Sequence, residues 1–237
     1  MSMEGWMRLD KYLQLTKRLS KKEIQQLLKQ QAITVNENKA TSVKQDISRT
    51  DRICISGIKI TEPPYLYLMV NKPAGVLSAL KDAQEKTIMD IIEHPRKDSL
   101  RIMGRLDRDT TGLMILTNDT QSIKRITLPK SHVEKEYEVT LRDPVSKAAV
   151  KAFADGLIID NDVQLKPAEL TILDDYHVKV IISEGRYHQI KKMFLSIHNE
   201  VLSLKRIRIH HLYLDASLSL GQFKCLDEKE IDKLLSK

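Results

Sequence analysis

The chain has 237 residues, enough for one large domain or two smaller ones with a hydrophobic core that needs no disulfides. Its two cysteines, Cys54 and Cys225, lie far apart without companions at metal-ligand spacing. This excludes a zinc ribbon and a cysteine-rich secreted scaffold, and we expect both to be buried, reduced thiols. No apolar run approaches the ~20 residues of a membrane helix, and residues 1–10 lack the apolar segment of a signal peptide. We therefore expect a cytoplasmic protein without a membrane partner.

The net charge of +7 is concentrated near the start of the chain. Residues 1–60 contain 12 Lys and Arg against 6 Asp and Glu, a net charge of +6, whereas residues 61–237 contain 27 against 26, a net charge of +1. A basic segment beside a nearly neutral one indicates a polyanion-binding domain joined to a domain with another task. A lysine-rich surface that is merely solvated is the other interpretation of charge alone.

Two short amphipathic helices are predicted first. One runs from Arg8 to Thr16 and has apolar residues at helical spacing, namely Leu9, Tyr12 and Leu13. The second helix begins at Ser20, which is predicted to form a capping box with Glu23. Its apolar face consists of Ile24, Leu27 and Leu28. Their outward faces carry Lys11, Lys17, Arg18, Lys21, Lys22 and Lys29.

Short strands are predicted next, at residues 33–35 and 51–60, where Ile53 and Ile55 alternate with polar residues. Two prolines in residues 61–64 remove backbone donors and favour an extended chain. We therefore expect an N-terminal α+β domain at residues 1–60, a linker at 61–64 and a second domain at 65–237.

The opening helix and the turn after the second helix carry a recognisable pattern, Arg8-Leu9-Asp10-Lys11-Tyr12-Leu13 and Val35-Asn36-Glu37. With the basic second helix between them, they resemble the S4 RNA-binding domain, although Glu37 stands where glycine is common. The resemblance implies two helices, a small sheet and RNA contacts from Arg8, Lys11, Lys17, Arg18, Lys21 and Lys22. Such contacts to phosphates supply affinity but little sequence choice.

Residues 65–237 alternate strands and helices without an internal repeat, which predicts a mixed α/β domain of catalytic size. The expected strands are residues 65–70, 114–116, 135–141 and 178–183. The expected helices are residues 147–156 and 188–198.

The densest run of polar residues precedes the strand at 114–116 and reads Gly104-Arg105-Leu106-Asp107-Arg108-Asp109-Thr110-Thr111-Gly112-Leu113. It lacks the Gly-Lys-Ser/Thr ending of a Walker loop. A carboxylate nucleophile and a plain turn capped by Asp107 are the two interpretations. Asp107 and Asp109 do not indicate a glycosidase pair, because residues two apart in one loop need not face a common bond. No metal-ligand spacing recurs among His188, His198, His210 and His211, so we expect no metal site.

Residues 104–113 match in full the motif Gly-Arg-Leu-Asp-X-X-Thr-X-Gly-Leu, and the chain resembles the pseudouridine synthases that carry it. Three further stretches agree, at residues 71–75, 134–137 and 184–193. Together with the S4 domain, these stretches look most like the RsuA-type branch, which modifies uridine 516 of 16S ribosomal RNA (rRNA). The resemblance covers about residues 7–232. It implies an α+β protein whose larger domain has a mixed, mostly antiparallel sheet.

The resemblance also implies roles for single residues. Asp107 matches the catalytic aspartate, Arg186 is implied to pair with it and keep it ionised, and the Tyr137 ring is implied to pack on the uracil. A stacked uridine must be flipped out to reach a buried carboxylate, and Arg105 is implied to fill the vacated space. Near phosphates we expect Lys72, Lys191 and Lys192, although a solvated helix face is the alternative for Lys191 and Lys192. Since the isomerisation needs no redox change, we expect no cofactor.

We therefore expect a monomeric rRNA pseudouridine synthase that acts on 16S rRNA, either naked or in a partly assembled small subunit. A 23S rRNA synthase of the same family and a non-catalytic S4 RNA-binding protein are the alternatives. One departure bears on the target, because His210 stands where the family's Arg-X-Arg-X-Gly stretch usually ends in glycine. A histidine there implies an altered turn or a different RNA contact.

Overall fold

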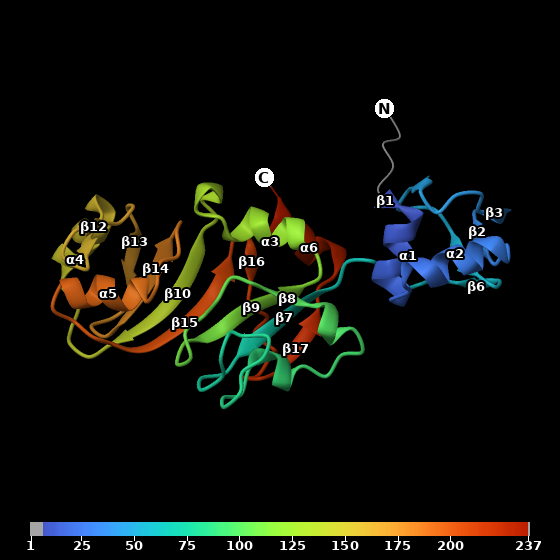
Figure 1. The fold of residues 1–237 in the computed structure, drawn as a ribbon. Helices are drawn as coiled ribbons and strands as arrows, with labels where there is room; N and C mark the ends of the chain where they lie inside the picture. Colours follow the sequence, from blue (N-terminus) through green and yellow to red (C-terminus); the bar gives the residue numbers. More distant parts are fainter. Residues whose placement is uncertain (1–6, 237) are drawn as a thin grey trace. The chain divides into compact units, whose positions relative to one another are not determined.

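The computed structural model describes residues 7–236, which divide into two compact units between Tyr65 and Leu66 (Figure 1). Each unit has its own hydrophobic core. Leu13 and Ile24 are buried in the first core, and Tyr65 packs against it. The second core is larger and contains Leu68, Met114 and other residues of the central sheet.

The first unit contains the two predicted helices, α1 (Leu9–Lys17) and α2 (Lys21–Lys29). The predicted capping box between Ser20 and Glu23 is present. One small sheet has the order β3-β2-β5-β6, and β1 pairs with β4. The strands are β1 (Met7–Arg8), β2 (Ile33–Val35), β3 (Asn38–Lys39), β4 (Asp46–Ile47), β5 (Ile53–Ile55) and β6 (Ile58–Lys59). The predicted α+β fold of this unit is confirmed.

The turn between β2 and β3 keeps a left-handed backbone without glycine. Asn36 has φ +49° and Glu37 has φ +70°. The Asn36 side chain stabilises the turn, because its amide nitrogen donates to Asp51 at 2.8 Å and its oxygen accepts from the Arg52 N–H at 2.8 Å. Glu37 therefore adopts the conformation for which glycine is usual at this position.

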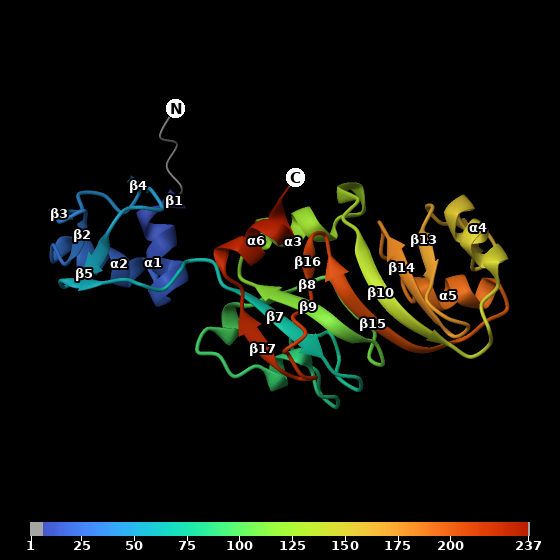
Figure 2. The same cartoon turned by 180° about the vertical axis from the view of Figure 1, so that it is seen from behind.

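In the second unit, nine strands of the described residues form one mixed, mostly antiparallel sheet, as predicted (Figures 1 and 2). Its path is β13-β14-β10-β15-β9-β7-β17, with β8 beside β9 and β16 beside β15, and the β15–β9 pair is parallel. The strands are β7 (Tyr67–Lys72), β8 (Arg101–Met103), β9 (Thr111–Thr117), β10 (Lys135–Leu141), β13 (Glu169–Ile172), β14 (His177–Ile182), β15 (Val201–Ile209), β16 (Leu212–Tyr213) and β17 (Phe223–Cys225). A separate hairpin joins β11 (Ile158–Ile159) to β12 (Val163–Gln164).

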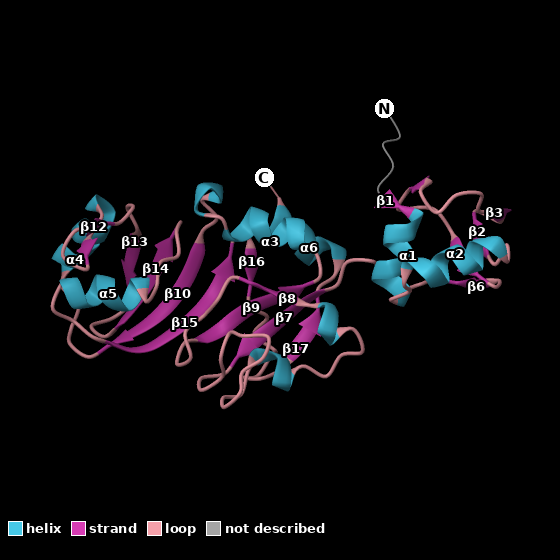
Figure 3. Cartoon of the chain, in the orientation of Figure 1, coloured by secondary structure: helices cyan, strands magenta, loops and turns pink. Residues whose placement is uncertain are grey.

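The helices of this unit are α3 (Thr120–Thr127), α4 (Lys147–Asp155), α5 (Gln189–Ser196) and α6 (Glu228–Leu235), with single 3-10 turns at Ile88–Ile91, Lys97–Ser99 and Pro129–Ser131. α4 and α5 lie beside β13 and β14, where Phe153 meets Phe194 at 5.0 Å between ring centroids (Figure 3). α3 and α6 lie near β8 and β16. Among the described residues, no helix is both long and apolar enough to cross a membrane.

Several expectations change in detail, among them the strand expected at residues 114–116, which spans Thr111–Thr117. The first strand of this unit begins at Tyr67 instead of residue 65 and continues through Lys72, because Asn71 and Lys72 pair with β9. Residues 51–60 form the hairpin of β5 and β6, whose turn contains Gly57 at φ +80°. The expectation of two buried thiols is wrong for Cys225, which is exposed at the end of β17, and right for Cys54.

Candidate active site

The segment from Gly104 to Leu113 contains the loop between β8 and β9 and the start of β9, and a buried lysine holds its backbone. Lys72 is fully buried at the end of β7. Its Nζ donates to the carbonyl oxygens of Asp107 at 3.0 Å, Arg108 at 3.1 Å, Thr110 at 2.9 Å and Pro73 at 3.1 Å. Burial lowers the pKa of Lys72 to about 8, and the nearby carboxylates of Asp109 and Asp107 oppose that shift. The expectation that Lys72 lies near phosphates is therefore wrong, since its ammonium faces main-chain oxygens inside the protein.

The segment after Lys72 holds the same loop at two further points. The Gly75 N–H donates to the Arg108 carbonyl at 2.8 Å. The Ser78 hydroxyl donates to the Leu106 carbonyl at 2.5 Å and accepts from the Leu106 N–H at 3.0 Å. Ser78 lies outside the motifs, so the sequence carried no signal for this role. These contacts fix the loop backbone on both sides of Asp107.

The far end of the loop depends on a close approach of two strands. Gly112 on β9 pairs with Arg206 on β15 and has φ +100°. A Cβ atom at Gly112 would lie 2.2 Å from the Arg206 carbonyl oxygen, so only glycine fits. The buried Arg206 guanidinium donates from Nε to the Leu113 carbonyl at 2.8 Å and from Nη1 to the Arg105 carbonyl at 3.4 Å.

Tyr137 lies on the same face of the sheet as the Arg206 side chain. Across neighbouring strands, Tyr137 of β10 pairs with Arg206 of β15, which pairs with Gly112 of β9. Directly opposed residues share a face, and two strand spacings amount to roughly 10 Å. Tyr137 is buried in the core. The sheet thus carries the Tyr137 side chain on the face where Arg206 reaches the loop.

Asp107 is partly exposed and lies near two cationic or ionisable side chains. Its carboxylate lies 3.6 Å from His188 Nε2 and 3.5 Å from Lys191 Nζ, and 27% of the side chain is exposed. Lys191 lies in the first turn of α5, and His188 is the residue directly before the helix. The site is therefore completed by the first turn of α5.

Arg186 does not make the expected pair with Asp107. It lies before α5, is exposed, and its Nε is 3.5 Å from Glu184. Glu184 is buried and accepts from the Lys166 N–H at 3.0 Å. The reason for the difference is the start of the helix, because α5 directs Lys191 to the loop and leaves Arg186 in the preceding turn.

Lys191 bridges two carboxylates of the loop. In addition to Asp107, its Nζ contacts both carboxylate oxygens of Asp109, at 2.6 and 2.7 Å. This hydrogen bond lowers the pKa of Asp109, whose side chain is 69% exposed. Lys192 instead pairs with Asp160 at 2.6 Å. Lys191 thus stands within the site, where the sequence predicted only a phosphate contact or a solvated face.

The other predicted RNA-binding residues lie at the surface of their own units. Arg105 is exposed on the loop beside Asp107. Within the first unit, Lys17 pairs with Glu62 at 2.7 Å and Arg8 pairs with Asp10. The exposed basic residues of α1, α2 and their flanks are Arg8, Lys11, Lys17, Arg18, Lys21, Lys22 and Lys29.

His210 takes the left-handed conformation that a glycine would supply. It has φ +55° in the two-residue turn between β15 and β16. Its N–H donates to the Glu134 carbonyl at 2.8 Å, and its Nε2 lies 2.9 Å from the Ser236 carbonyl oxygen. The turn is therefore retained with histidine in place of glycine.

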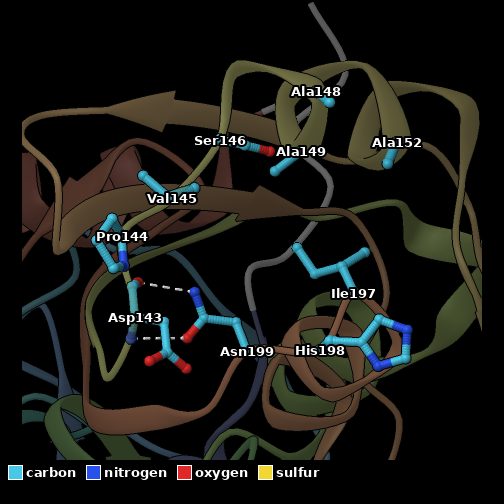
Figure 4. Close-up of a pocket in the computed structure, with 10 residues that line it drawn as sticks. All are labelled: Asp143, Pro144, Val145, Ser146, Ala148, Ala149, Ala152, Ile197, His198 and Asn199. Atoms are coloured by element: carbon cyan, nitrogen blue, oxygen red, sulfur yellow. Dashed lines mark hydrogen bonds between the residues drawn. The ribbon is translucent and has the colours of Figure 1, made fainter.

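A pocket of about 360 Å³ lies elsewhere in this unit, between the start of α4 and the end of α5 (Figure 4). Its walls are mostly small or apolar, and the Asn199 amide closes one side by pairing with the Asp143 backbone at 3.1 and 2.9 Å. It contains none of the predicted site residues. Within residues 7–236, no three His, Cys, Asp or Glu side chains are grouped so that they could hold a metal ion.

Comparisons with known families identify the class of this two-unit protein. The family RNA pseudouridylate synthase matches residues 66–196, and the S4 domain matches residues 7–53. The chain belongs to the RNA pseudouridylate synthase family, which confirms the predicted family and enzyme class.

Relatives match nearly the whole chain. The ribosomal small subunit pseudouridine synthase A of Pasteurella multocida is 42% identical over 95% of this chain and 98% of that protein. The protein of the same name from Haemophilus influenzae is 40% identical over 97% of this chain and 100% of that protein. A Bacillus subtilis relative, described as an uncharacterized RNA pseudouridine synthase, is 37% identical over 96% of this chain and 98% of that protein. A crystal structure of a pseudouridylate synthase, 40% identical, covers 97% of this chain and all of that one with a TM-score of 0.70.

Proposed function

We propose that this protein isomerises one uridine of 16S rRNA to pseudouridine, at the position equivalent to uridine 516, with Asp107 as the catalytic carboxylate. The target is supported by the small-subunit names of relatives that are 40–42% identical over nearly their whole length. The left-handed backbone of His210 is compatible with this target, because it is the conformation that a glycine would supply at this position.

The setting of Asp107 carries the proposal. Its backbone oxygen is held by the buried Lys72, and its carboxylate lies 3.5 and 3.6 Å from Lys191 and His188. A neighbouring cation favours the ionised form of a carboxylate. A rigid loop also keeps the reacting group in one position, which lowers the entropic part of a barrier. Asp109, by contrast, is largely exposed and closely paired with Lys191.

The reaction is balanced without a redox partner. The bond between uracil N1 and ribose C1′ breaks, the uracil turns, and C5 bonds to C1′ while C5 loses a proton and N1 gains one. Asp107 acts at the ribose or at the base, Lys191 takes the charge-pairing role that the motif had implied for Arg186, and Tyr137 packs on the uracil. Arg105 enters the space that the extruded uridine leaves in the RNA.

RNA binding is shared between the units. The S4 unit supplies phosphate contacts from Lys11, Lys21, Lys22 and their basic neighbours, since residues 1–60 carry +6 of the net +7. We infer that a monomer binds rRNA of a partly assembled small subunit in the cytoplasm. Phosphate contacts position the RNA, so the choice of uridine falls to the residues around Asp107.

The test is a carbodiimide primer-extension map of rRNA from cells that lack this protein. The cells are re-supplied with the wild type, with Asp107→Asn, or with Asp109→Asn as a matched carboxylate control. We expect one stop in 16S rRNA, restored by the wild type and by Asp109→Asn but not by Asp107→Asn. A stop in 23S rRNA would replace the proposed target. No stop in any rRNA would leave a non-catalytic S4 RNA-binding protein.

A further inference from the structure

Tyr187 is an exposed aromatic residue beside the Asp107 site. It keeps 74% exposure, the highest of any aromatic residue in the described part of the chain. Its ring nevertheless has a defined position, because it stacks on the His188 ring with 3.8 Å between centroids and 20° between planes. An exposed ring gains little from apolar burial in the folded protein, so packing does not account for its place.

The stacked rings of Tyr187 and His188 extend from the solvent to the Asp107 carboxylate. His188 Nε2 is 3.6 Å from Asp107 on one side, while the His188 ring supports Tyr187 on the other. His188 adopts this position with φ +53°, a conformation that is uncommon outside glycine. Left-handed residues at functional sites persist where the surroundings hold them. The backbone before α5 is thus shaped to bring both rings to the edge of the site.

The surroundings of Tyr187 include two lysines, each paired with carboxylates of neighbouring segments. Lys192 Nζ lies 5.5 Å from the Tyr187 ring centroid, and Lys191 is the adjacent residue in the first turn of α5. An exposed aromatic ring beside lysines has the composition of single-strand nucleic-acid sites, in which bases stack on rings and phosphates meet cations. An apolar protein partner would be matched less well, because two lysines would have to be buried with it.

We propose that Tyr187, supported by His188, is a stacking platform for the unpaired RNA base next to the extruded uridine. This inference rests on the proposed function. Once the target uridine leaves its stack, its neighbour loses one stacking face, and the platform replaces that face at the edge of the Asp107 site. Stacking tolerates any base, so the platform holds the RNA open without selecting its sequence.

The experiment measures tritium release from 16S rRNA transcripts labelled at uracil C5, with kcat and KM determined separately. The variants are Tyr187→Ala, which removes the ring, and Tyr187→Phe, which keeps the ring and removes the hydroxyl. Tyr176→Ala, at an exposed tyrosine in the turn between β13 and β14, is the matched control. Thermal unfolding of each variant confirms that it is folded.

We expect Tyr187→Ala to lower kcat/KM about tenfold, mostly through KM, because loss of one stacked base costs on that order. Tyr187→Phe and Tyr176→Ala remain near the wild type. An unchanged KM for Tyr187→Ala would overturn the platform, and so would an equal loss in Tyr187→Phe, which would assign the effect to the hydroxyl.

A second measurement separates this inference from the proposed function. If the wild type releases no tritium, the proposed function fails on its own. Binding of a fluorescein-labelled 16S rRNA fragment by the same variants then tests the platform. A Kd about tenfold higher for Tyr187→Ala, but not for Tyr187→Phe, supports it. Equal Kd values for all variants overturn it.

Discussion

Replacing Lys72 by methionine tests whether the buried ammonium holds the Asp107 loop. Methionine retains much of the volume but donates no hydrogen bond, so four carbonyl oxygens lose their donor. Two of them keep another partner, since the Asp107 oxygen accepts from Thr110 and the Arg108 oxygen from Gly75. The oxygens of Pro73 and Thr110 carry the main loss, at ~1–3 kcal/mol for each unsatisfied group.

We therefore expect Lys72→Met to lower the free energy of unfolding by about 2 kcal/mol at pH 7. This is the low end of the cost for the two oxygens together, because burying the ammonium of the wild type is itself costly. A loop displaced by about 1 Å lowers turnover by roughly 100-fold. Urea unfolding and tritium release measure the two effects, with Lys81→Met as a control at an exposed lysine of the same segment. Turnover within threefold of the wild type would refute the argument.

The pH dependence of Lys72→Met has a definite sign. The pKa of Lys72 is about 8 in the folded protein against 10.5 when unperturbed, so the unfolded chain binds more protons between these values. Stability of the wild type relative to Lys72→Met should therefore rise from pH 8 to pH 10.5, by up to ~3 kcal/mol. Unfolding curves at pH 7.5 and pH 10 measure it, and a gap that narrows with pH would contradict the assigned burial.

Three further predictions address other parts of the site and fold. Gly112→Ala should cost more than ~3 kcal/mol of stability, because its Cβ would lie 2.2 Å from a backbone oxygen at φ +100°, whereas Gly185→Ala meets nothing within 4 Å and should unfold like the wild type. Lys191→Met should lower kcat by about 100-fold, and Arg186→Met, which breaks an exposed pair, by less than about threefold; the reverse order would restore Arg186 as the partner of Asp107. A maleimide should label Cys225 in the native protein and Cys54 only after unfolding, as peptide mapping would show.

Local patterns predicted part of the regular elements, whereas α3, α6 and the long strand β15 were not predicted. The alternation in residues 135–141 corresponds residue for residue to β10, and the Ser20 capping box begins α2 as expected. The strand β7 was harder, because Asn71 and Lys72 look like loop residues. They extend the strand because β9 pairs with them and the loop carbonyls satisfy the buried ammonium. No periodicity reveals such a partner.

The identity of the cation beside Asp107 shows a different limit of prediction from sequence. The stretch 184–193 contains Arg186, Lys191 and Lys192, each close enough in sequence to serve. Which one reaches the loop depends on where α5 begins, and a shift of one residue rotates a side chain by about 100° around a helix. Predicted helix ends are not accurate to one residue. The motif therefore located the site, while only the fold assigned the partner.

The contacts of Lys72 also explain how two distant motifs form one site. The lysine of residues 71–75 touches main-chain oxygens of residues 107, 108 and 110, and no side chain of the loop. Such contacts constrain the path of the backbone and leave the side chains at 108 and 109 free to differ, which agrees with the two unspecified positions after the aspartate in the motif. The Asp107 carboxylate is thus positioned by a backbone that a distant strand shapes, so its geometry should survive Arg108→Ala and Asp109→Ala but not the loss of Lys72.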